Sequence, residues 1–233
     1  MTWINTDVRP GLPLILCILV GLAGCCTPDA HRIDAAQTPS VHSPAESSAP
    51  TPALAEFFRE LYRPQTFISH DSTADNPGWL GLPVAPAPVE RLRAGINSLE
   101  GCVLQHRGEA HITVITPPEA ERIRAHDPSL SMDVIQAVAL PMLNVARWNS
   151  PGIGSLEQDG KQTWFLVVDS PDLRALREHI ARTFLLPIEV LDPDAQDLHV
   201  TIGFIGGDFW PPAGSKGPAS LSPELNWQAV LGL

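Results

Sequence analysis

AHITVIT at residues 110–116 and LHVTIGF at residues 198–204 are the two stretches that decide the fold of this chain. Apolar and polar residues alternate in both, which is the period of a β-strand with one buried face. The apolar members are predicted to pack into a core, and Gly203 in the second strand is expected to leave room for a ligand. The polar members share the other face and are predicted to face a common space: His111, Thr113, His199 and Thr201.

The His-x-Thr pattern is informative because it occurs twice in matching strand context. With 27 Ser and Thr residues and 8 His in the chain, about one such match is expected by chance. A third match, His70-Asp71-Ser72, lies among polar residues with no strand pattern and is interpreted as accidental. The other two lie 88 positions apart, far enough for a repeated lobe. The alternative interpretation is two half-buried histidines hydrogen-bonded to neighbouring threonines.

Helix and strand signals alternate from Leu54 onward. Thr116-Pro117-Pro118-Glu119 predicts a capping box at the start of a helix, and Asp159-Gly160 predicts the turn of a β-hairpin. Helices are predicted over 54–62, 89–99, 117–126, 131–140 and 171–184, and strands over 153–157 and 162–168 beside the two histidine strands. The tail after residue 205, rich in Pro, Gly and Ser, has no predicted element.

The sequence resembles the two-histidine (2H) phosphoesterases, a superfamily named for a pair of His-x-Thr/Ser motifs. AHITVITPPE at 110–119 and GIGSLEQDGKQTWFLVV at 152–168 are similar to the 2H module of the Swiss-Army-knife RNA-repair group, and the resemblance covers residues 54–216. It implies an α+β, bilobal fold, with two antiparallel sheets around a central cleft and helices outside. It also implies catalysis without a metal or cofactor on cyclic phosphates or RNA ends. By the match, the family's four catalytic positions are His111, Thr113, His199 and Thr201.

These residue types suit the hydrolysis of a cyclic phosphodiester. The reaction needs a base to activate water and an acid to protonate the departing oxygen, and imidazole titrates nearest to neutral pH. Two histidines facing one cleft supply both groups, while the threonine hydroxyls can donate to the non-bridging phosphate oxygens. The order of the motifs in the sequence leaves open which histidine is the acid.

Weaker candidates lie outside the two motifs. Lys216, in a Pro/Gly loop, is the candidate substrate-binding residue because it is able to reach phosphate, although a solvated lysine is the favoured interpretation. Arg177 is expected at the surface or in pairing between lobes, and Trp148, after Arg147, is expected to be a half-buried core residue rather than a base-stacking one. Three further histidines lack metal-ligand spacing and are interpreted as structural: His106, His126 and His179.

The amino terminus is predicted to be a targeting signal. Leu12–Gly24 is an uncharged apolar run of 13 residues, short of the ~20 that span a bilayer. It ends in Leu22-Ala23-Gly24-Cys25, which resembles the lipobox of bacterial lipoproteins. That resemblance implies cleavage before Cys25, acylation of Cys25 with chains such as palmitate, and an envelope anchor facing the periplasm. Because Cys26 follows instead of Asp, the outer membrane is favoured. The alternative is an uncleaved anchor or a buried apolar segment.

The composition of the chain predicts where its parts begin and end. Residues 25–53 are rich in Ala, Pro, Ser and Thr and are predicted to be a disordered tether, between a signal at 1–24 and a 2H phosphoesterase-like domain at 54–233. The formal net charge of −11 argues against a broad basic groove for long nucleic acid. The expected partners are therefore a small phosphodiester or oligonucleotide and, through the anchor, a membrane.

Cys102 is expected to be a small buried hydrophobe, with a bridge to Cys26 as the alternative.

Three functions from different classes follow from these observations. The first is a phosphoric diester hydrolase acting on 2′,3′-cyclic nucleotides or oligonucleotide ends. The second is a non-catalytic envelope lipoprotein that uses the cleft to bind a phosphorylated ligand, and the third is a structural lipoprotein whose motifs are accidents of the core. Two intact motifs favour the first, because a binding site has little reason to keep two proton-transfer histidines.

Overall fold

The computed structural model describes residues 50–67, 70, 78–209 and 214–233. They belong to one of two units of the chain, Ser48–Leu233. The predicted signal, the lipobox with Cys25, Cys26 and the tether up to residue 49 lie outside the described residues.

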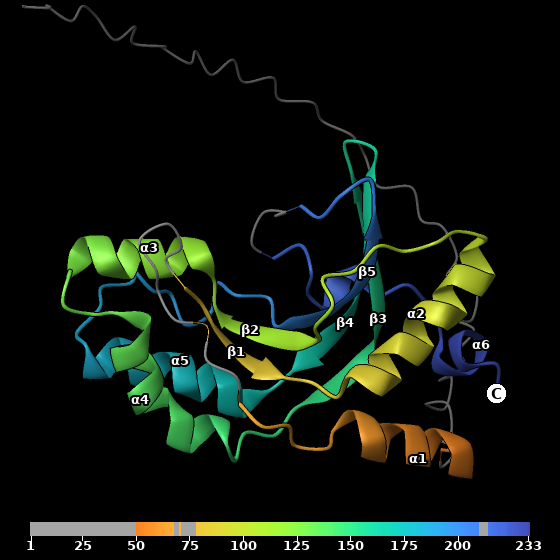
Figure 1. Ribbon diagram of the computed structural model, residues 1–233, viewed down its shortest axis with the longest axis horizontal. Coiled ribbons are helices and arrows are strands. Elements are labelled where there is room, and N and C mark those ends of the chain that lie inside the picture. The colour runs from red at the N-terminus through yellow and green to blue at the C-terminus, as the bar shows by residue number, and fades with distance from the viewer. Residues whose placement is uncertain (1–49, 68–69, 71–77, 210–213) are drawn as a thin grey trace, which may run out of the picture. The chain divides into compact units, whose positions relative to one another are not determined.

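The described residues form an α+β architecture (Figure 1), which confirms the predicted class. Its elements in chain order are α1 (Pro52–Leu61), β1 (Leu80–Pro83), α2 (Pro86–Glu100), β2 (His111–Ile115), α3 (Pro117–His126), α4 (Met132–Leu143), β3 (Asn149–Gln158), β4 (Lys161–Asp169), α5 (Pro171–Thr183), β5 (His199–Ile205), the 3₁₀ turn η1 (Pro218–Ser220) and α6 (Trp227–Leu231). None of the helices in this part of the chain is long and apolar enough to cross a membrane.

The strands pair in one antiparallel sheet in the order β1-β2-β5-β4-β3. The two strands that carry histidine motifs, β2 and β5, are neighbours within it, with Ile112 opposite Val200. The two separate sheets that the family resemblance implied are therefore not confirmed. The physical reason is the β2–β5 pairing itself, which joins the strands of both motifs into a continuous hydrogen-bonded sheet across the described residues.

Two groups of helices pack beside this sheet. α2 contacts α1, α6 and β5, while α5 contacts α4 and β2. In Figure 1 the group of α1, α2 and α6 lies on the right and the group of α3, α4 and α5 on the left. Each group buries apolar side chains at helical spacing, such as Leu92 and Ile96 in α2 and Leu173, Leu176 and Ile180 in α5. Burial of these faces, rather than helix propensity, holds the helices in place.

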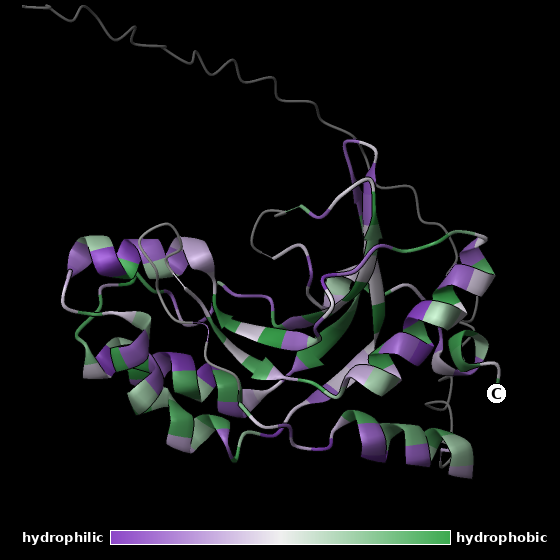
Figure 2. Ribbon diagram, in the orientation of Figure 1, coloured by the Kyte–Doolittle hydropathy of each residue, from purple (hydrophilic) through white to green (hydrophobic). Residues whose placement is uncertain are grey.

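The predicted alternation of the two histidine strands is confirmed. Ile112, Val114, Val200 and Ile202 are fully buried, and Phe204 is nearly so. Figure 2 shows hydrophobic residues concentrated in the strands, whereas hydrophobic and hydrophilic residues alternate along the helices. The buried face fixes the register, because a slip of one residue would turn every apolar side chain of a strand to the other face.

Local signals place several element boundaries. Thr116 and Glu119 form the predicted capping box: Glu119 Oε2 accepts from the Thr116 amide at 2.8 Å, and Thr116 Oγ1 accepts from the Glu119 amide at 3.3 Å. Asp159 and Gly160, with φ of 52° and 72°, make the predicted hairpin turn between β3 and β4. β1 and α6 were not predicted, because 4 and 5 residues are too few to show a period.

Candidate active site

β2 and β5 bring the two His-x-Thr motifs to one face of the sheet. Carrying the antiparallel register on from Ile112 opposite Val200 sets His111 opposite Thr201 and Thr113 opposite His199. All four side chains are partly buried and line one narrow cavity. The residues expected to face a common space therefore do so.

Three charged side chains join the motif residues around this cavity. Arg107 and Asp208 form an ion pair on its wall, and Lys216 lies on another part of the wall. Gln196 and Phe209 complete the lining. Both signs of charge are thus present where a phosphate would approach the histidines.

His199 is held by hydrogen bonds at both ring nitrogens. Its Nδ1 lies 2.7 Å from the backbone oxygen of Asp197, and its Nε2 lies 3.3 Å from Lys216 Nζ. The ring edge also meets Phe165, with 5.8 Å between centroids. Burial and then the positive charge of Lys216 lower the pKa of His199 to about 3, although the hydrogen bond to Asp197 acts in the opposite direction.

Lys216 is buried rather than solvated, with an exposed fraction of 5%. Its ammonium lies 5.5 Å from the centre of the Phe165 ring, and its backbone amide donates to Asp197 Oδ2 at 3.0 Å. Burial lowers the pKa of the Lys216 ammonium to about 8. The structure thus brings the candidate substrate-binding residue into contact with a motif histidine.

His111 lies in a more apolar setting. Trp79 contacts its ring at 4.3 Å between centroids, and His70 stacks on Trp79 at 3.7 Å. His111 Nδ1 is buried without a hydrogen-bond partner in the described part of the chain, and the nearest carboxylate, Glu109, is 3.7 Å away. Burial, followed by the charges of Arg107 and His70, lowers the pKa of His111 to about 4.

The space expected at Gly203 is filled by protein. A Cβ at this position would lie 2.8 Å from the Cβ of Leu104 and 2.9 Å from the backbone oxygen of Gln105. Gln105 pairs with Phe204 in an isolated bridge, which brings its segment against β5. The prediction that Gly203 leaves room for a ligand is therefore wrong, and the glycine instead permits close approach of backbone.

The described residues also line two larger cavities. One of about 380 Å³ adjoins His111 and is lined in part by His70, Trp79 and Glu109. The other, of about 540 Å³, contains Trp148 but neither motif. Trp148 is partly buried and packs edge-on against Tyr62 at 4.8 Å, as a half-buried core residue would. The cavity next to His111 is the one placed to extend the candidate site.

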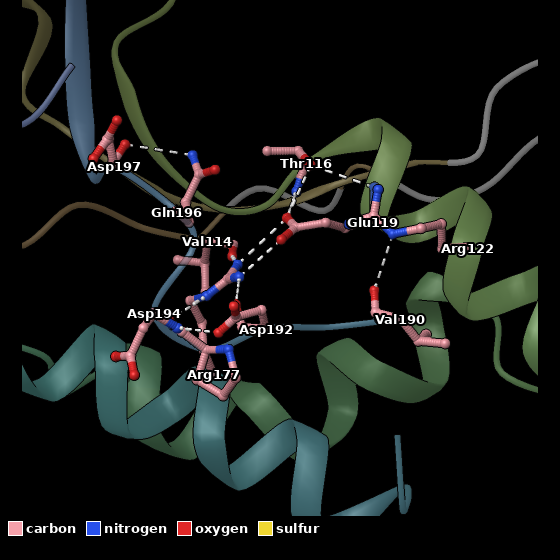
Figure 3. Close-up of polar contacts among 11 residues, drawn as sticks. Val114, Thr116, Glu119, Arg122, Arg177, Val190, Asp192, Asp194, Gln196 and Asp197 are labelled. Atoms are coloured by element: carbon pink, nitrogen blue, oxygen red, sulfur yellow. Dashed lines mark hydrogen bonds and ion pairs between the residues drawn. The ribbon is translucent and has the colours of Figure 1, made fainter. Parts of the chain in front are cut away.

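Arg177 makes buried hydrogen bonds to the segments that carry the two motifs. Its guanidinium bonds the Glu119 carboxylate, at 2.8 Å for the closer contact, and the backbone oxygens of Val114, Asp192 and Pro193 (Figure 3). Arg177 is fully buried. The expected surface position is therefore wrong: this side chain joins the end of β2 to the loop that leads into β5.

Sequence reasoning missed several neighbours of the motif histidines. His70 was set aside as an accidental match, although its ring stacks in the wall beside His111. His106, interpreted as structural, is exposed and lines a small cavity with His111 and Thr201. Asp197 was included in the strand predicted over 197–205, whereas β5 begins at His199, and the only sequence signal for its role is a polar residue two positions before a motif histidine. Within the described ranges, no group of three or more His, Cys, Asp or Glu residues is arranged to hold a metal ion.

Comparison with known proteins identifies the domain. The family model of the Swiss Army Knife 2H phosphoesterase domain matches residues 78–209, more than half of the chain, and this range contains both motifs. No curated protein and no solved structure matches the chain. With two His-x-Thr strands side by side and this match across them, the chain belongs to the Swiss Army Knife 2H phosphoesterase family.

Proposed function

We propose that this protein is a cyclic phosphodiesterase that opens 2′,3′-cyclic phosphates of nucleotides or of oligonucleotide ends, with the two histidines moving the protons. The family supports a phosphoesterase-type hydrolase. The observation that carries the finer proposal is the convergence of His111, Thr113, His199 and Thr201 on one cavity from adjacent strands.

The chemistry follows from the placement of these groups. Water attacks phosphorus while one motif histidine removes its proton. The other motif histidine protonates the ribose oxygen that leaves. The hydroxyls of Thr113 and Thr201, each opposite a histidine in the register, donate to the non-bridging oxygens as phosphorus becomes five-coordinate. All the proton transfers are assigned to groups of the chain, so the proposed reaction proceeds without a metal.

Charge and cavity size favour a small substrate. The net charge of −11 repels a long polyanion. The cavity of about 380 Å³ beside His111 falls in the range of roughly 300–1,000 Å³ that holds small ligands. We assign it to the nucleoside part of the substrate, with the phosphoryl group between the two motifs and near Lys216.

Location belongs to the proposal as well. The Leu22-Ala23-Gly24-Cys25 tetrapeptide after a 13-residue apolar run supports export and acylation at Cys25. The enzyme would then face the periplasm on a tether, where short RNA fragments would be its substrates.

The test is hydrolysis of a nucleoside 2′,3′-cyclic phosphate by the purified protein in excess EDTA, with the monoester product identified by ³¹P NMR. We expect turnover by the wild type and its loss in His111→Ala. A protein that leaves cyclic mononucleotides and oligonucleotide cyclic ends intact but still binds nucleoside monophosphates would contradict catalysis and establish the binding function. Absence of both activities would leave the motifs as structural features of the family fold.

A further inference from the structure

The cavity of about 540 Å³ has no part in the reaction proposed above, although it adjoins the cavity beside His111. It is lined by the segment that follows α1, the end of β1 and the segment between α4 and β3. Gln65 and Pro83 line both cavities, and Pro83 pairs with His111 in the β1–β2 register. The two cavities therefore share a wall, and this wall stands one strand away from a motif histidine.

The lining of the 540 Å³ cavity suits a ligand with negative charge. Arg63 and Arg147 belong to its wall, and both are exposed and make no ion pair with another described residue. No Asp or Glu is among the described residues that line it, although the chain has 26 acidic residues against 15 basic ones. Two arginines without a neighbouring acid form a local site for phosphate on a chain that is otherwise acidic.

Trp148 supplies the aromatic surface of the same cavity. Its indole is partly buried and meets Tyr62 edge-on, with 4.8 Å between centroids and 87° between the ring planes. Tyr62 is itself fixed, because its hydroxyl accepts from the Ser150 amide at 3.1 Å and its ring stacks on Phe58. No described aromatic ring stacks on a face of Trp148. An indole held in this way in a cavity wall is suited to stack a nucleobase.

The covalent structure of an oligonucleotide leads into this cavity. A terminal 2′,3′-cyclic phosphate occupies both ribose hydroxyls of its own nucleoside, so the chain can continue only from the 5′ oxygen. With the phosphoryl group between the motifs and the terminal nucleoside in the cavity beside His111, the next nucleotide has to lie beyond that nucleoside. The 540 Å³ cavity meets this condition, because it shares Gln65 and Pro83 with the first cavity and contains neither motif.

We propose that the 540 Å³ cavity binds the penultimate nucleotide of an oligonucleotide substrate, with its base on Trp148 and its phosphate held by Arg63 and Arg147. The inference rests on the proposed function and narrows it. The preferred substrate is then the cyclic phosphate end of a short oligonucleotide, and a cyclic mononucleotide fills only part of the site.

The experiment compares adenylyl-(3′→5′)-adenosine 2′,3′-cyclic phosphate with adenosine 2′,3′-cyclic phosphate as substrates of the purified protein. Stacking of one base on an aromatic side chain changes affinity by about 10- to 100-fold, and we expect the wild type to prefer the dinucleotide in kcat/KM by that factor. Trp148→Ala should remove most of the preference and change kcat/KM on the mononucleotide by less than about threefold. Trp227→Ala is the matched control and should keep the preference, because Trp227 is also partly buried against Phe58 but does not line the cavity.

A second set of variants changes only exposed side chains, since Trp148→Ala also removes a contact with Tyr62. The double variant Arg63→Gln/Arg147→Gln should lower the preference for the dinucleotide by about three- to tenfold. Arg59→Gln/Arg182→Gln removes the same charge from two exposed arginines outside the cavity wall and should leave the preference unchanged.

Binding measurements separate this inference from the proposed function. Isothermal titration should show that adenylyl-adenosine 3′-monophosphate binds more tightly than adenosine 3′-monophosphate to the wild type and not to Trp148→Ala. A wild type that keeps this difference but hydrolyses neither cyclic phosphate would overturn the proposed function and support the subsite. Hydrolysis of both substrates without preference, a preference that persists in Trp148→Ala, or equal losses on both substrates in that variant would overturn the subsite alone. Absence of both hydrolysis and the difference in binding would overturn the two together.

Discussion

At the scale of single residues, the two motif histidines have the same sequence context but different surroundings. His111 meets an aromatic wall through Trp79, whereas His199 is fixed between Asp197 and Lys216. Repetition of a motif therefore does not imply repetition of a role. These surroundings come from residues outside the two motif strands, namely His70 and Trp79 beside His111 and Asp197 and Lys216 beside His199.

Replacement of either histidine tests whether both are needed. His111→Ala and His199→Ala should each lower kcat/KM on a 2′,3′-cyclic mononucleotide by about 10²–10⁴, since each removes a positioned proton-transfer group. Thr113→Val and Thr201→Val are the matched comparison and should cost less, because the second hydroxyl remains to bind the phosphoryl oxygens. Steady-state kinetics of variants that are shown to be folded measure these losses. A histidine variant with wild-type activity would exclude that residue from the mechanism.

The buried histidines also predict how stability depends on pH. The folded pKa values of about 4 for His111 and 3 for His199 lie below the ordinary value of 6.5, so between these values the unfolded chain binds more protons. Their contribution is complete above the unfolded pKa and is lost progressively as pH falls from that value toward the folded values. Urea unfolding of the wild type should show a loss of stability from about pH 7 to about pH 5, and His199→Gln should lose less. Parallel curves would contradict the burial of a neutral ring at position 199.

The residues that sequence alone identifies are those with a local signature. His111, Thr113, His199 and Thr201 were predictable because strand alternation and motif spacing are read over a few positions. The contact between Lys216 and His199 was not, because the two residues lie 17 positions apart and no local period relates them. The error at Gly203 has the same origin: the sequence shows a missing side chain, but not that Leu104 fills the space.

At the scale of elements, a buried ion pair fixes the two histidine strands relative to each other. Arg177 in α5 bonds Glu119 of α3, Val114 of β2 and the oxygens of the loop before β5. Burial alone would raise the pKa of Glu119, but its bonds to Arg177 and Thr116 lower it. The contribution of the Glu119 carboxylate to stability is therefore present above its ordinary pKa and is lost as pH falls through the lower folded value.

Removing one member of this pair should be costly. Arg177→Met leaves the Glu119 charge buried without its partner, and we expect a loss of about 3–5 kcal/mol in the free energy of unfolding. Arg182→Met in the same helix is the control: its exposed ion pair with Glu178, at 3.9 Å, should contribute less than about 1 kcal/mol. Chemical denaturation measures both. Equal effects of the two changes would mean that the buried pair does not hold the strands.

Elements with local signals were also predictable, whereas their arrangement was not. The Thr116 capping box and the Asp159-Gly160 turn each depend on side chains within a few positions, and both predictions are confirmed. The pairing of β2 with β5 joins residues 88 positions apart. No local period reports such a pairing, so the separation into two sheets was inferred from the family resemblance alone.

At the scale of the whole molecule, the net charge and the proposed location both bear on the choice of substrate. The net charge of −11 disfavours the binding of long RNA. An enzyme tethered in the envelope would meet mainly fragments that diffuse to it, which agrees with a site adjoined by one cavity of moderate size. The proposed anchor is therefore part of the functional argument and calls for its own test.

The proposed anchor is tested by replacing, one at a time, the two adjacent cysteines at the end of the apolar run. In full-length protein made in a bacterium with a periplasm, Cys25 should become the first residue and carry acyl chains, because the run is too short to span a bilayer and ends in Leu22-Ala23-Gly24-Cys25. Mass spectrometry of the amino-terminal peptide should find the acylated form. Cys25→Ser should abolish processing and detergent-phase partition, whereas Cys26→Ser should leave both intact. An intact Met1, or an unmodified Cys25 in membrane-derived protein, would show that the apolar run is not a lipoprotein signal. The proposal that the substrates are RNA fragments in the periplasm would then lose its support.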